Sequence, residues 1–191
     1  MLVSPTALKG TFRPREVAAA LAAGVRRACP QARVLECPVS DGGDGLVDVL
    51  LGPSAFRESL EVVGPLGEPV QGEIGWRDGE TAVIESASAC GLALVPVERR
   101  DPLKATSRGV GQLVAAARDR GARTIVVGLG GTATVDGGTG MARAWGWTFR
   151  GAAGEPLAEG GGALGDLAEV SAGWRLEVEV VGLTDVTNPL L

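Results

Sequence analysis

The sequence contains no histidine and no tyrosine, and phenylalanine occurs only three times in 191 residues. The absence of histidine excludes Ser-His-Asp catalysis, acid–base catalysis by imidazole and zinc sites built on histidine. Proton transfer in an enzyme of this composition would fall to Asp, Glu or Lys. The shortage of aromatic side chains also leaves few platforms on which nucleic-acid bases could stack.

Basic residues are also fewer than acidic ones: the sequence has 18 Lys and Arg and 23 Asp and Glu, which give a formal net charge of −5. This balance disfavours non-specific binding to nucleic acid or to an anionic membrane. Cys29, Cys37 and Cys90 lack metal-ligand spacing, and we expect them to be small buried thiols. The N-terminus lacks the pattern of a signal peptide and no apolar run reaches membrane-spanning length, so we expect a cytoplasmic protein.

Strand-loop-helix units recur along the chain and predict an α/β fold with a mainly parallel, Rossmann-like sheet flanked by helices. Between 58 and 86, three β-rich runs joined by turns predict an antiparallel or mixed subdomain, with Asp78-Gly79 as a hairpin signal. We therefore divide the chain into a first α/β segment (1–56), a β-rich segment (57–98) and a second α/β segment (99–191).

Apolar spacing predicts how the helices face the core. A helix over 14–28 would present Val17, Leu21 and Val25 as one stripe, and a helix over 46–51 would turn Val47 and Leu50 inward. The hydroxyl of Ser107 is expected to cap a third helix, which ends near residue 120.

The most informative stretch is the loop from Gly128 to Gly140, GLGGTATVDGGTG, which follows an apolar strand and leads into a helical pattern. In α/β folds such loops bring backbone N–H groups and a helix N-terminus to phosphate groups. The spacing is not that of a Walker A loop, because no lysine follows the glycines, and it fits GxGxxG only loosely. A tight turn that needs the positive φ of glycine stays an alternative.

Polar side chains follow several predicted strands at the same edge of the sheet. They are Lys9, Asp41, Asp44, Asp136 and Asp185, and Glu85 and Ser86 end a further strand and could join them. Because ligands bind beyond the carboxyl ends of strands in open α/β sheets, we expect these groups to face one crevice. Each residue taken alone fits a turn, a cap or a solvated side chain equally well.

This set of residues favours Mg²⁺-assisted phosphoryl transfer, in which carboxylates hold the metal and Lys and glycine N–H groups neutralise phosphate charge. Asp41, Asp44, Asp136 and Lys9 are the predicted catalytic residues, and Asp41, Asp136 and Asp185 are the candidate metal ligands. The sequence does not decide which Asp acts as the base. The residues expected to bind substrate or phosphate are Gly42, Gly43, Gly130, Gly131, Thr132, Thr134, Gly137, Gly138, Asp185 and Asn188.

Six phrases, in order along the chain, resemble the bacterial glycerate kinase family of the glycerate 2-kinase type. They are LKGT from Leu8, DGGDG from Asp41, GPLGEPV from Gly64, ACGL from Ala89, GLGGTATVDGG from Gly128 and DVTNPL from Asp185. The resemblance implies a two-domain α/β enzyme that phosphorylates D-glycerate with ATP and Mg²⁺ in a cleft. It also implies that family members continue past the equivalent of Leu191, so the chain resembles an N-terminal portion.

Some positions depart from the family pattern. Thr6 and Thr187 stand where the family has acidic residues, Asp44 replaces a Glu, and Val135 replaces an amide. These losses leave open an alternative, in which the chain is a truncated or diverged module that binds a ligand or a partner without catalysis. Such a module would expose an apolar docking face, and a homodimer would cover it. A third hypothesis, a nicotinamide-dependent oxidoreductase, would need Glu155 or Glu159 as its ribose ligand.

Overall fold

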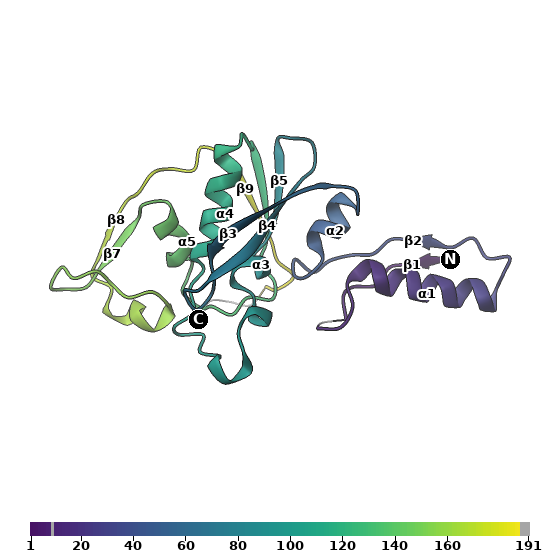
Figure 1. Cartoon of the computed structure of the whole chain (residues 1–191), viewed down its shortest axis with the longest axis horizontal. Helices are drawn as coiled ribbons and strands as arrows, with labels where there is room; N and C mark the ends of the chain where they lie inside the picture. The colour runs from purple at the N-terminus through teal and green to yellow at the C-terminus, as the bar shows by residue number, and fades with distance from the viewer. Residues whose placement is uncertain (9, 188–191) are drawn as a thin grey trace.

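The computed structural model describes residues 1–8 and 10–187, and a five-stranded mixed sheet forms its centre (Figure 1). Its strands lie in the order β3 (Phe56–Val63), β4 (Pro69–Trp76), β5 (Thr81–Glu85), β6 (Thr124–Gly128) and β9 (Glu179–Leu183). β3, β4 and β5 pair antiparallel, whereas β5, β6 and β9 pair parallel. The β-rich segment therefore does not form a sheet of its own, because its strands make up the antiparallel half of the central sheet. The domain boundaries at 56 and 98 stay predictions.

Helices cover both faces of this sheet. On one face, α4 (Arg108–Asp119) buries Val110, Leu113 and Val114 against Ile84 and Ile125. On the other face, α2 (Leu46–Leu51) packs its Leu46 and Val47 against Val83. The alternation of buried β-branched residues along β5 and β6 explains this three-layer arrangement, because successive strand residues point to opposite faces.

The α2 helix departs from expectation at Leu50, which is 46% exposed rather than inward. The helix has only six residues and packs through its first turn, so its last turn reaches past the edge of the small core. The N-terminal end of α2 follows Gly45, whose φ of 87° suits glycine.

The N-terminal unit lies to one side of the central sheet (Figure 1). In it, β1 (Leu2–Val3) pairs parallel with β2 (Leu35–Glu36), and α1 (Pro14–Ala28) contacts both strands. The buried residues of α1 are Pro14, Ala18 and Ala22, and the expected central residue of the stripe, Leu21, is 51% exposed. The stripe prediction was wrong by one helical position, because the small alanines let α1 approach the narrow two-stranded sheet.

Ion pairs tie the N-terminal unit to the rest of the molecule. Asp48 on α2 pairs with Arg13, which precedes α1, at 3.1 Å, and it also pairs with Arg57 on β3. Burial of Asp48 would raise its pKa, but the hydrogen bonds and charges of Arg57 and Arg13 outweigh it and hold that pKa below the usual value. This carboxylate therefore joins three elements that are far apart in the sequence.

Shorter elements complete the chain. They are α3 (Ala87–Cys90), the 3₁₀ helices η1 (Leu92–Leu94), η2 (Val97–Arg99) and η3 (Gly161–Asp166), α5 (Thr139–Ala144), and an antiparallel pair of β7 (Thr148–Arg150) with β8 (Glu169–Ser171). Of the cysteines, Cys90 is buried as expected, whereas Cys29 and Cys37 are exposed because they end α1 and follow β2 at the surface. No helix among the described residues is both long and apolar enough to span a membrane. The predicted α/β class, with parallel strands flanked by helices, is confirmed.

Candidate active site

A cleft of about 500 Å³ opens at the carboxyl ends of the parallel strands. β5, β6 and β9 end level with one another, since Glu85 pairs with Gly128 and Gly128 pairs with Leu183. The loops that follow β2, β6 and β9 all reach this edge. Of the predicted site residues, those that line the cleft are Asp41, Gly43, Asp44, Gly130, Gly131 and Asp185.

Glycines allow the three loops to pack backbone against backbone and form the floor of the cleft. The N–H of Gly130 donates to the carbonyl of Gly42 at 3.0 Å, and the N–H of Leu129 donates to the carbonyl of Leu183 at 2.9 Å. A Cβ on Gly128 would lie 2.3 Å from the Gly42 oxygen, and one on Gly130 would lie 2.7 Å from the Cα of Gly43. No side chain fits at these contacts, so glycine is required there for packing.

The carboxylates differ in how firmly they are held. Asp41 is half-buried and accepts a hydrogen bond from the N–H of Gly43 at 3.0 Å, whereas Asp44 and Asp185 are exposed to the cleft. Glu85 lies beside Asp44 at the start of α2 and accepts from the N–H groups of Val47 at 2.8 Å and Gly45 at 3.2 Å. Glu85 thus accepts hydrogen bonds from the free N–H groups at the N-terminus of α2. The sequence predicted only that Glu85 could join the cleft, and not this role.

The electrostatics of Glu85 favour its protonated form. Burial raises the pKa of Glu85 above its usual value, the charges of Asp44 and Glu73 add to the effect, and the two backbone hydrogen bonds offset part of it. A second, smaller cavity of about 250 Å³ places Glu85 next to Asp44, and it shares Ala7 and Gly10 with the cleft. Glu85 therefore adds a buried carboxyl group to the same edge.

The donor set fits a magnesium ion that is bound together with a substrate. No group of three or more Asp, Glu, Cys or His within residues 1–8 and 10–187 is arranged to hold a metal by itself. Mg²⁺ is commonly bound by one or two carboxylates, with water and substrate phosphates as the other ligands. Asp41, Asp44 and Asp185 in one cleft match that mode and not a closed protein cage.

Asp136, predicted to be catalytic and a metal ligand, does not line the cleft. It is 2% exposed, and its Oδ2 accepts from the N–H and hydroxyl of Ser107 at 2.8 and 2.9 Å and from the N–H of Gly140 at 3.1 Å. Its Oδ1 accepts from the N–H of Gly138 at 3.0 Å. These bonds place Asp136 as the carboxylate around which the glycine loop folds.

Ser107 was expected to cap α4 with its hydroxyl, and that expectation was wrong. Ser107 stands at the N-cap position, but its side chain makes no capping hydrogen bond within α4. The hydroxyl donates to Asp136 and accepts from the N–H of Met141 at 3.1 Å. The hydroxyl oxygen that a cap would use accepts from the N–H of Met141 instead, and the result is a link between α4 and α5.

The remaining predicted residues separate into three groups. Gly42 is buried under the cleft, Thr132 and Thr134 line an adjoining compartment, and Gly137 and Gly138 border a different groove beside Trp145 and Trp174. Lys9 and Asn188 lie outside the described residues. The glycines at 137 and 138 have φ values of 60° and 79°, which fits the turn alternative for that part of the loop.

Arg100 also lines the cleft. It follows η2, and its Nε donates to the carbonyl of Val95 at 3.4 Å. The cleft otherwise carries carboxylates, so a guanidinium on its wall provides a donor for an anionic ligand. No periodic or motif signal marks Arg100 in the sequence.

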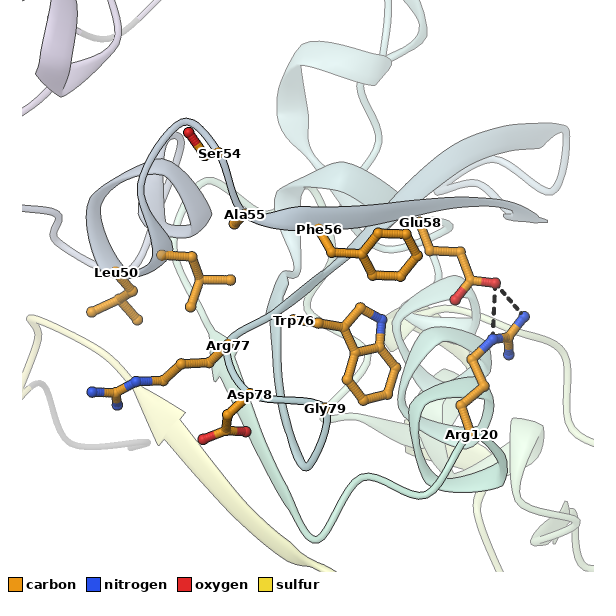
Figure 2. A pocket seen from close by; sticks show the side chains of 11 residues that line it. Leu50, Ser54, Ala55, Phe56, Glu58, Trp76, Arg77, Asp78, Gly79 and Arg120 are labelled. Carbon is orange, nitrogen blue, oxygen red and sulfur yellow. Dashed lines mark hydrogen bonds and ion pairs between the residues drawn. The ribbon is translucent and has the colours of Figure 1, made fainter.

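A larger cavity of about 710 Å³ lies at the opposite end of β5 and contains none of the glycine loops (Figure 2). Trp76 and Phe56 face it from β4 and β3, and Leu50 reaches it from the end of α2. Of its charged groups, Glu58 pairs with Arg120 at 2.7 Å and Asp78 accepts from its own turn.

Comparison with known proteins bears directly on this cleft. Residues 1–191 match the Glycerate kinase family. The chain belongs to the glycerate kinase family. It is 42% identical to a glycerate kinase of Bacillus subtilis over 196 residues and 42% identical to a glycerate 2-kinase of Escherichia coli over 197 residues. All of the chain is covered in both cases, against 51% and 52% of those proteins.

A solved structure agrees with the fold of this glycerate kinase family member. A crystal structure from Salmonella typhimurium LT2 that carries the name glycerate kinase 2 superimposes with a TM-score of 0.80 at 40% identity. It covers 99% of this chain and 52% of that one. The chain thus spans about half the length of the curated relatives that it matches.

Family membership replaces the oxidoreductase hypothesis. The acidic residue nearest the required spacing, Glu159, forms an ion pair with Arg108 at 3.1 Å, and Glu155 lies between β7 and β8. Neither position is at the carboxyl end of a strand of the central sheet. The hypothesis of a nicotinamide-dependent oxidoreductase is therefore supported neither by the family of the chain nor by an acidic residue placed to bind a ribose.

Proposed function

We propose that this chain forms the active-site cleft of an enzyme that phosphorylates D-glycerate with ATP and Mg²⁺. The observation that carries the proposal is the meeting of Asp41, Asp44 and Asp185 with the Gly130–Gly131 backbone in one cleft at the carboxyl ends of parallel strands. Membership of the glycerate kinase family supports the reaction class. A two- or three-carboxylate cleft beside glycine N–H groups matches what phosphoryl transfer needs.

The roles follow from burial and position. Asp44 and Asp185, both exposed to the cleft, are available to a metal–nucleotide complex, which when bound supplies charge neutralisation and a transferable phosphoryl group. The hydroxyl of glycerate attacks the terminal phosphorus, the bond to the leaving ADP oxygen breaks, and the hydroxyl proton passes to a cleft carboxylate. Asp41 is oriented for such contact by the hydrogen bond from Gly43. Arg100 provides a donor for the carboxylate or phosphate groups of the reactants.

The proposal is tested by coupling ADP release to D-glycerate, with the 191-residue chain and with the complete reading frame in which it occurs. We expect turnover with at least one of the two proteins and a loss of more than tenfold in kcat for Asp44→Asn and Asp185→Asn. Glu61→Gln, an exposed carboxylate on β3, is the control and should leave kcat unchanged. Absence of turnover in both proteins, with glycerate or nucleotide still bound in calorimetry, would favour the non-catalytic module instead.

A further inference from the structure

A second, mostly apolar compartment adjoins the cleft. It has a volume of about 170 Å³, well above the roughly 30 Å³ that a water molecule occupies in the liquid, and Leu92 and Arg100 line both spaces. Its walls include Val95 and Ala105, which are 3% and 1% exposed. The compartment is therefore a side pocket that opens into the candidate active site at these two residues.

The walls of this side pocket are held by hydrogen bonds rather than left loose. The segment after Gly131 is bound to the end of α3, because the N–H of Leu92 donates to the carbonyl of Gly131 and the N–H of Ala133 donates to the carbonyl of Cys90, each at 2.8 Å. On the other side, the hydroxyl of Thr134 donates to the carbonyl of Ala105 at 2.8 Å. A pocket fixed in this way needs little reorganisation to take a flat, rigid ligand.

Arg100 stands where the side pocket meets the cleft. Because Arg100 lines both spaces, its positive charge lies between the apolar side pocket and the cleft, which is rich in carboxylates and glycine N–H groups. A ligand that matches these two environments has an apolar end for the side pocket and an anionic end that reaches Arg100 and the cleft. Glycerate, small and polar throughout, has no part that suits the apolar chamber.

We infer that the side pocket binds the adenine base of the nucleotide, with its phosphates passing Arg100 into the cleft. This inference rests on the proposed kinase function and assigns one ligand subsite within it. Apolar side chains of Leu92, Val95 and Ala133 contact the faces of the base. The glycine backbone and cleft carboxylates are then left for phosphate, metal and glycerate.

The test separates base binding from phosphate binding by using three probes: adenosine, ADP with Mg²⁺, and inorganic tripolyphosphate with Mg²⁺. Ala133→Phe fills the side pocket without touching the cleft carboxylates, and Ala153→Phe places the same side chain at an exposed site as a control. Leu92→Ala widens the opening between the side pocket and the cleft. Because the Leu92 side chain is 41% exposed, we expect this variant to fold even if Ala133→Phe does not. Binding is measured by calorimetry, and folding by thermal melting.

With Ala133→Phe we expect ADP affinity to fall at least tenfold and adenosine binding to be lost, while tripolyphosphate binds as in the parent chain. Leu92→Ala should weaken ADP three- to tenfold and leave tripolyphosphate unchanged, and Ala153→Phe should change neither. Unchanged ADP affinity in folded Ala133→Phe and in Leu92→Ala overturns the subsite while leaving the kinase proposal standing. If the parent chain and its complete reading frame bind neither ADP nor tripolyphosphate, both proposals fall.

Discussion

The carboxylate of Asp136 and the residue Ser107 are joined twice, by hydrogen bonds of 2.8 Å from the Ser107 N–H and 2.9 Å from its hydroxyl. The two residues are 29 positions apart, and both are buried. With the N–H groups of Gly138 and Gly140, they make one carboxylate the common acceptor for the starts of α4 and α5. The position of the glycine loop thus depends on a charge that does not line the cleft.

Replacing this charge should destabilise the fold. In Asp136→Asn, one acceptor oxygen becomes an NH₂ group that faces buried donors, so we expect the free energy of unfolding to fall by about 1–3 kcal/mol. Denaturant unfolding measures the loss. Asp119→Asn, at a carboxylate that is 61% exposed, is the matched control and should change stability by less than about 0.5 kcal/mol. A variant as stable as the parent chain would show that the hydrogen bonds to Asp136 contribute little.

The packed floor of the cleft should reject a single methyl group. A Cβ on Gly130 would lie 2.7 Å from backbone atoms of Gly43, so Gly130→Ala should lower the free energy of unfolding by about 1–3 kcal/mol. Gly24, inside α1 with open space at its Cβ position, offers the opposite control. Gly24→Ala should raise stability by about 0.5–1 kcal/mol through helix propensity. Equal effects of the two substitutions in thermal melting would contradict the packing argument.

Glu85 should make stability depend on pH. Because burial raises its pKa in the folded chain, protonated Glu85 is favoured by folding, and stability is lost as pH rises from the ordinary value of 4.5 through the raised folded value. Glu85→Gln cannot ionise, so the stability of the parent relative to this variant should fall as the pH rises above 4.5. A parallel pH profile for parent and Glu85→Gln would exclude the effect.

The three thiols should differ in reactivity. Burial, together with the negative charge of Asp136, raises the pKa of Cys90 to about 12, whereas Cys29 and Cys37 are exposed. At pH 8 an aromatic disulfide reagent should therefore label Cys29 and Cys37 rapidly and Cys90 only after denaturant is added. Peptide mapping of the labelled sites provides the check. Rapid labelling of Cys90 in the folded chain would mean that α3 opens on the time scale of the reaction.

The N-terminal unit should make the 191-residue chain self-associate. Leu2, Leu21 and Leu35 are 64%, 51% and 53% exposed on a two-stranded parallel sheet and its helix, although parallel sheets normally have both faces covered. Light scattering of the isolated chain should give a mass above 19.4 kDa that falls in Leu21→Asn. Leu103→Asn, at a leucine that is 55% exposed on a distant loop, should not change the mass. A monomer at all concentrations would refute this expectation.

Local patterns predicted the elements well where one residue's neighbours decide its conformation. The helix at Pro14–Ala28 has the expected bounds, and the strand at Thr81–Glu85 lies in the expected β-rich region, because a proline at the first helical turn and an apolar run after Asp78-Gly79 are local signals. The faces of the helices were predicted less well. Ala18 and Ala22, not Leu21, meet the sheet, and the choice depends on how closely two elements can approach.

The sequence predicted which loops form the cleft, but not what each side chain in those loops contacts. The rule that ligands bind beyond strand ends correctly grouped Asp41, Asp44 and Asp185. Only Asp185 follows a strand of the central sheet, since Asp41 and Asp44 follow β2 of the separate two-stranded sheet. Asp136 obeys the same rule in sequence yet turns inward, because its donors come from Ser107, which belongs to another part of the chain. Arg100 had no local signal, since a loop folded against α3 places it.

The glycine contacts between the loops at 42, 128–130 and 183 have a consequence for tolerance to substitution. Three segments that are separated by more than fifty residues from one to the next share one floor with no side chain between them. A saturation library across Gly42, Gly128 and Gly130 would therefore be depleted of nearly every replacement, although a side chain added there would point into protein and not toward a substrate. Invariance at these glycines in any future alignment would reflect steric exclusion by the neighbouring backbone rather than chemistry.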